Sequence, residues 1–82
     1  MIKLVTLLVR RDDLSHQEFL DYWRTEHAPR AKEMPHVEKY VIDVPTDPEK
    51  SEFDGMAELY FEDMDALAAA FDSPTGQSVE AD

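Results

Sequence analysis

The N-terminal segment, residues 2–9 (IKLVTLLV), predicts a β-strand that is apolar on both of its faces. Because side chains alternate across a strand, the two apolar sets are Ile2, Leu4 and Leu8 on one face and Val5, Leu7 and Val9 on the other. A strand of this kind needs an apolar layer against each face. In a chain of 82 residues, helices can cover one face, and we expect a second subunit to cover the other.

Residues 14–29 (LSHQEFLDYWRTEHAP) predict a capped amphipathic helix. Ser15 and Glu18 form a capping-box signature, in which the hydroxyl satisfies a first-turn N–H and the carboxylate reaches back to the cap. We therefore expect the helix to begin near Ser15. Pro29 disfavours helical backbone in the residue before it, so we expect the helix to end near that position.

One face of this predicted helix is apolar and contains a histidine. At about 100° per residue, one arc holds Phe19, Leu20, Trp23 and His27. The rings of Trp23 and His27 are neighbours, because the two residues are four positions apart. An imidazole titrates near neutral pH and can donate or accept a proton, which makes His27 the candidate catalytic residue. The spacing alone favours a plainer alternative, a buried histidine held by one backbone hydrogen bond.

Two more strands and a second helix follow. Residues 37–44 and 56–62 predict antiparallel strands joined by the polar loop 45–55, which closes on an Asp-Gly turn. From Asp63, a candidate N-cap, apolar residues recur at helical spacing toward Pro74.

The resulting order, β-α-β-β-α, is that of a ferredoxin-like α+β unit without its last strand. The tail, residues 73–82, allows a short helical turn but shows no strand pattern. We expect a single domain spanning residues 1–82.

The composition excludes several classes of partner and site. A net charge of -11, from 19 acidic and 8 basic residues, disfavours nucleic acid and anionic membrane surfaces. The absence of cysteine excludes disulfides and thiolate catalysis. The apolar run at residues 2–9 is too short to span a membrane and lacks a small-residue cleavage site, so we expect a cytoplasmic protein.

The remaining candidate residues support little chemistry besides proton transfer. The spacing of His16, His27 and His36 matches no metal-binding motif, and His16 is expected to face solvent at the helix start. With two glycines the chain has no phosphate-binding loop. Tyr40 and Tyr60 are candidate hydrogen-bonding groups. A cleft lined by aromatic rings with one histidine suits an apolar or aromatic small molecule, with neither metal nor nucleotide cofactor.

Over residues 2–80 the chain resembles the EthD family, named for ethyl tert-butyl ether degradation, in the dimeric α/β-barrel superfamily. The most specific motif is F-x-x-Y-W-x-x-x-H-A-P, from Phe19 to Pro29. The Asp54-Gly55 pair, which leads into a strand ending in Phe61, supports the resemblance.

The resemblance implies a ferredoxin-like α+β fold with an antiparallel sheet. Two such sheets would pack face to face in a homodimer, with a pocket in each subunit between sheet and helices. Members of the family usually continue to a further strand that pairs beside the first, and this sequence stops at Asp82. We therefore expect the backbone edge of residues 2–9 to be covered by a neighbouring molecule, by a swapped segment or by residues outside this sequence.

The resemblance also implies site residues. The helix histidine of the family falls on His27, and the aromatic residue of its second strand falls on Tyr40. We expect the substrate to contact Phe19, Trp23, Tyr40 and Phe61.

The superfamily includes a muconolactone isomerase, polyketide-tailoring monooxygenases and cyclases, and haem-degrading enzymes, so the fold alone does not select a reaction. The first hypothesis is a catabolic or tailoring enzyme, an isomerase, lyase or oxygenase-like protein without cofactor. It would use His27 to move a proton on an apolar, carbonyl-bearing or aromatic substrate. The alternative is a non-catalytic module that binds a small ligand or serves as an accessory subunit.

Overall fold

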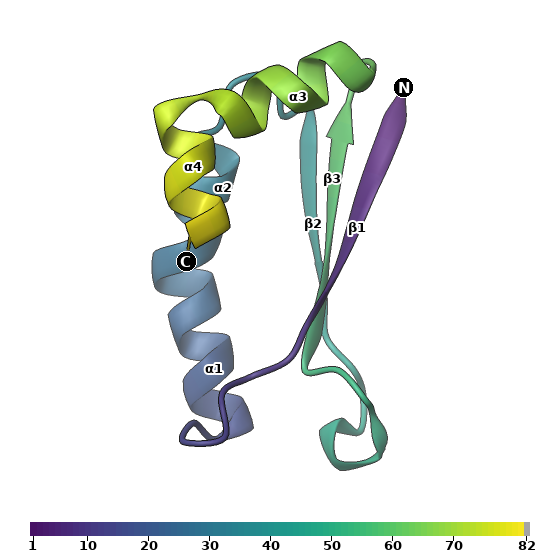
Figure 1. The fold of residues 1–82 in the computed structure, drawn as a ribbon. Coiled ribbons are helices and arrows are strands. Elements are labelled where there is room, and N and C mark those ends of the chain that lie inside the picture. The colour runs from purple at the N-terminus through teal and green to yellow at the C-terminus, as the bar shows by residue number, and fades with distance from the viewer. Residues whose placement is uncertain (82) are drawn as a thin grey trace.

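The computed structural model describes residues 1–81, which form an antiparallel sheet with the α-helices on one side of it (Figure 1). In chain order the elements are β1 (Ile2–Leu8), α1 (His16–Tyr22), η1 (Trp23–His27), α2 (Ala28–Lys32), β2 (Lys39–Asp43), η2 (Pro48–Lys50), β3 (Gly55–Phe61), α3 (Met64–Asp72) and α4 (Pro74–Ala81). The predicted order β-α-β-β-α and the α+β class are confirmed.

The sheet has the strand order β1-β3-β2, and both pairings are antiparallel. In the register, Leu4 of β1 and Tyr40 of β2 both lie opposite Leu59 of β3. Within residues 1–81, β1 pairs only with β3, so its other backbone edge has no partner strand. A fourth ferredoxin-like strand would occupy that edge.

The segments α1, η1 and α2 follow one another without a break and form the long helix of the fold (Figure 1). The capping box is present: the Ser15 hydroxyl accepts a hydrogen bond from the Glu18 N–H at 3.1 Å, and the Glu18 carboxylate accepts one from the Ser15 N–H at 2.9 Å. The helix therefore begins where the sequence predicts.

The expectation that this helix ends near Pro29 is wrong, because the helix continues through α2 to Lys32. The intervening segment η1 is a π-helical turn, in which the Ala28 N–H donates to the Trp23 carbonyl five residues back. A π-turn widens the helix next to Pro29, the residue that has no N–H to donate, so the chain can pass the proline and remain helical. His27 consequently lies inside a long helix and not at its end.

The core lies between this long helix, α3 and α4 on one side and the inner face of the sheet on the other. Its buried members are Leu20, Trp23, Ala28, Ala31, Met34, Ala57, Leu59, Phe61, Ala70 and Val79. The Asp63 carboxylate accepts a hydrogen bond from the Ala66 N–H at 2.8 Å and caps α3 as predicted. The tail forms the eight-residue helix α4, which is longer than the short turn that the sequence indicated.

The two faces of β1 have different environments. Ile2, Leu4 and Leu8 pack against the core, as the alternation predicts. On the opposite face Val5 and Leu7 are 47% and 60% exposed in the single chain. We call this side of the sheet the outer face; by alternation and register its residues are Lys3, Val5, Leu7, Lys39, Val41, Asp43, Met56, Glu58 and Tyr60.

Candidate functional site

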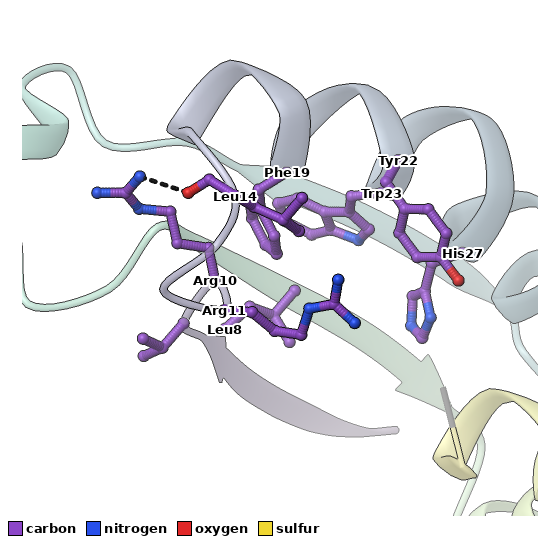
Figure 2. Close-up of a pocket in the computed structure, with 9 residues that line it drawn as sticks. Leu8, Arg10, Arg11, Leu14, Phe19, Tyr22, Trp23 and His27 are labelled. Carbon is purple, nitrogen blue, oxygen red and sulfur yellow. Dashed lines mark hydrogen bonds between the residues drawn. The ribbon is translucent and has the colours of Figure 1, made fainter.

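A cavity of about 410 Å³ lies between the end of β1, the loop that follows it, and one side of α1 and η1 (Figure 2). Its lining residues are Leu8, Val9, Arg10, Arg11, Leu14, Phe19, Tyr22, Trp23 and His27. A volume of this size falls in the range of cavities that hold small organic ligands.

Aromatic rings form one wall of the cavity. The Phe19 and Trp23 rings are tilted by 39° with their centroids 5.7 Å apart. Trp23 is only 1% exposed, and its indole Nε1–H donates a hydrogen bond to the Tyr40 hydroxyl at 3.1 Å. Burial raises the pKa of Tyr40, although the bond from Trp23 opposes this shift. Tyr40 therefore stays a neutral acceptor that holds the indole in one orientation.

Gly55, the first residue of β3, leaves the space that the Trp23 ring occupies. A Cβ atom built at Gly55 would overlap the Trp23 ring. The backbone of Gly55 does not have a positive φ, so the glycine is required by close approach and not by turn geometry. Gly55 of the Asp54-Gly55 pair, read from the sequence as a turn signal, thus also makes room for the Trp23 ring.

We expect the substitution Gly55→Ala to lower the free energy of unfolding by about 1 to 3 kcal/mol, because the added methyl group must displace the Trp23 ring. Urea denaturation followed by circular dichroism measures the loss. In a Trp23→Phe background the smaller ring leaves room for the methyl group, so the same change should cost less. An equal cost in both backgrounds would show that the Trp23 contact is not responsible.

His27 lines the cavity and lies in the π-turn η1, which also contains Trp23. It is half-buried, and Figure 2 shows it with Tyr22 at the end of the cavity away from Leu14. π-Turns inside α-helices are frequent at functional sites, since they change which side chains share one side of the helix. Here the turn places an imidazole, which can exchange a proton, beside an aromatic wall.

Two arginines from the loop after β1 also line the cavity. The Arg10 guanidinium donates to the Leu14 carbonyl at 2.7 Å and lies 3.3 Å from a carboxylate oxygen of Asp54. Arg11 forms a bidentate pair with Asp13, in which Nε and Nη2 each lie 3.1 Å from a carboxylate oxygen. Sequence reasoning missed both arginines, although two basic residues side by side in a strongly acidic chain were a usable signal.

The loop that carries the arginines is held by Asp54. One carboxylate oxygen accepts a hydrogen bond from the Arg10 N–H at 3.0 Å, and the other lies 3.1 Å from Nδ1 of His16. The Asp54 N–H donates to the Leu8 carbonyl at 2.8 Å. The expectation that His16 faces solvent is wrong, because its ring is partly buried against Asp54.

These contacts determine the pKa of Asp54. Burial raises the pKa of this carboxyl, but the hydrogen bonds from Arg10 and His16 and the charges of both side chains outweigh burial and hold it below its usual range. A carboxyl whose pKa is lower in the folded chain stabilises the fold above its unfolded pKa of about 3.9, and that contribution is lost as the pH falls through the folded value.

We therefore expect Asp54→Asn to destabilise the protein at neutral pH by an amount that shrinks below about pH 4, where Asp54 of the unfolded chain is already protonated. Urea denaturation of both proteins across an acidic pH series measures this difference. Because only the difference is used, the titration of the other carboxylates cancels. A difference that is constant across the series would contradict the role assigned to the Asp54 charge.

The remaining predicted site residues lie in different places. Phe19, Trp23 and His27 all line the cavity. Tyr40 contacts Trp23 through its hydroxyl and is not among the lining residues. Phe61 is completely buried, with its ring 6.3 Å from that of Phe71, and does not line the cavity either. The lining residues that sequence reasoning missed are Leu8, Val9, Arg10, Arg11, Leu14 and Tyr22.

Across residues 1–81, no three side chains of His, Asp or Glu come together in a group that could hold a metal ion. Over the same residues, every helix is too short or too polar to cross a membrane.

The model of the EthD domain family matches residues 11–82 of the chain. The chain belongs to the EthD family. Among solved structures, it is similar to an EthD family protein from Bacillus halodurans C-125, with a TM-score of 0.83 and 25% sequence identity over 96% of this chain and 79% of that one. No curated protein matches the chain. The resemblance seen in the Phe19–Pro29 motif is therefore confirmed, and this EthD domain includes every cavity residue after Arg10.

Proposed function

We propose that this EthD-family chain is a small-molecule enzyme in which His27 transfers a proton to or from a substrate bound in the cavity. The substrate is apolar and carries a carbonyl group or an aromatic ring, and the reaction needs neither metal nor nucleotide. The observation that carries the proposal is that His27 lines a cavity of about 410 Å³ together with the rings of Phe19 and Trp23.

The aromatic residues of the cavity bind the substrate, and His27 moves the proton. A flat apolar substrate packs against Phe19 and Trp23, which exclude water from one side. A ring nitrogen of His27 accepts a proton from a carbon next to the substrate carbonyl, and the electron pair of the broken C–H bond passes to the carbonyl oxygen as an enolate. Return of the proton to another carbon completes an isomerisation, and loss of a leaving group from the enolate completes an elimination.

Solvent exchange tests this proposal even while the product is unidentified. Mixtures of small ketones, lactones and aromatic ketones are incubated with the protein in D2O, and proton NMR follows the C–H signals next to each carbonyl. We expect at least one compound to lose these signals faster with protein than without it. Compounds that bind, as shown by line broadening, but never exchange would contradict the enzyme and favour the non-catalytic binding module.

We also propose that two copies form a homodimer by packing their outer faces together. The exposed Val5 and Leu7 support this, since apolar side chains grouped on an uncovered sheet face are typical of interfaces. Two polar side chains of the face are paired with Glu58, which accepts a hydrogen bond from Tyr60 at 3.3 Å and lies 3.1 Å from Lys3 Nζ. Polar groups that already have partners cost less to bury.

The outer face also contains two interacting carboxyl groups, Asp43 and Glu58. A hydrogen bond to Glu58, followed by burial and the Glu58 charge, raises the pKa of Asp43, while bonds from Asp43 and Lys3 lower the pKa of Glu58. The opposite directions of these two pKa shifts mean that Asp43 takes up a proton before Glu58 as the pH falls.

A further inference from the structure

The cavity wall differs in charge from the rest of the chain. The protein has 19 acidic and 8 basic residues, yet the lining residues include Arg10, Arg11 and His27 and no aspartate or glutamate. Accepting the cavity as the ligand site, as the proposed function does, we infer that its ligand carries an anionic group, such as a carboxylate, and that Arg11 binds this group.

Arg10 already makes hydrogen bonds and an ion pair with other residues of the protein. Its backbone N–H and guanidinium contact Asp54, and its Nη1 donates to the Leu14 carbonyl. Figure 2 shows the Arg10 guanidinium turned away from Trp23 and His27, toward Leu14. Arg10 therefore orders the loop and does not offer its charge to the cavity.

Arg11 has the opposite arrangement. Figure 2 shows its guanidinium extended along the cavity toward His27. Its contacts with Asp13 use Nε and Nη2, so the Nη1 edge of the same guanidinium is available to a ligand. The side chain is 75% exposed, and an ion pair between exposed groups contributes little to stability, so Arg11 can also exchange Asp13 for a ligand carboxylate at small cost.

The aromatic wall, Arg11 and His27 together define a ligand with two unlike ends. Its apolar body packs on Phe19 and Trp23, its anionic head meets Arg11, and the atoms between them lie near His27. An arginine suits this task because its planar fork binds a carboxylate through two parallel hydrogen bonds. This refines the sequence-based expectation of an apolar ligand: the body is apolar, and one end is charged.

The test compares 4-phenylbutyrate with 4-phenylbutyramide, which share ring and chain and differ in the charged group. Trp23 is the single tryptophan of the protein and lines the cavity, so its fluorescence reports binding of either compound there. We expect the acid to bind about 10-fold more tightly than the amide, the scale of a charge-assisted hydrogen bond. Arg11→Gln should remove this preference, and Arg11→Lys should retain part of it.

Arg24→Gln is the matched control, because Arg24 is an exposed arginine of η1 outside the cavity lining, and its loss should leave the preference unchanged. Equal binding of acid and amide, or a preference that survives Arg11→Gln, would overturn the role of Arg11 while the cavity remains a ligand site. No response of Trp23 to either compound at millimolar concentration would overturn both this inference and the ligand site of the proposed function.

Discussion

Replacing Leu7 with glutamate is expected to convert the proposed dimer to a monomer at micromolar concentration. Leu7 is 60% exposed in the single chain and lies opposite Met56 on the outer face, so a carboxylate there remains solvated in the monomer. In a two-fold symmetric interface the change places two unpaired charges in the contact, close to the acidic pair Asp43 and Glu58. We expect the dissociation constant to rise at least about 100-fold, measured by sedimentation velocity.

Met64→Glu is the control for this experiment. Met64 is 63% exposed but begins α3, away from the outer face, so the same change in charge should leave the dimer intact. Circular dichroism of both variants confirms that each chain is folded. A wild-type protein that sediments as a folded monomer at micromolar concentration would reject the dimer, and so would a Leu7→Glu variant that remains a dimer.

The parts of the fold that the sequence predicted correctly depend on residues close together in the chain. The capping box at Ser15 and Glu18 and the cap at Asp63 involve partners three residues apart. Phe19, Trp23 and His27 are brought to one wall by a single helix. Local spacing specifies such features because the geometry of one helix fixes them.

The parts that the sequence did not predict depend on packing between distant segments. Asp54 bonds to residues 44 and 38 positions away, Arg10 and His16, and helical spacing carries no information about such pairs. The exclusion of Phe61 from the cavity depends on how α3 and β3 pack, since its ring lies against Phe71. The prediction that the helix ends near Pro29 was wrong because it assumed a regular α-helix, in which proline cannot continue the hydrogen-bond pattern. The π-turn before Pro29 changes that pattern, so the helix continues.

The second large effect is expected from His27→Gln. Glutamine keeps a polar amide of similar reach but cannot take up a proton near neutral pH, so it preserves hydrogen bonding and removes the base. For any compound whose exchange the wild-type protein catalyses, we expect the rate to fall at least about 100-fold. Binding, followed by Trp23 fluorescence, should change little, because the aromatic wall and Arg11 are untouched.

The control for this variant is His36→Asn. His36 is exposed, lies outside the cavity lining and has a φ of 70°, a backbone conformation that asparagine tolerates. It should exchange substrate protons at the wild-type rate. If His27 is instead a structural residue, His27→Gln should lower the free energy of unfolding by about 1 to 3 kcal/mol while ligand affinity is kept.

The proposed proton transfer between His27 and a ligand bound beside Trp23 and Phe19 can be measured directly as C–H exchange in D2O. NMR gives the exchange rate for wild-type protein and for His27→Gln with the same carbonyl compound at saturation. We expect catalysed exchange in the wild type and a loss of at least about 100-fold in the variant. Exchange at the same rate in both proteins would contradict the assignment of His27 as the base.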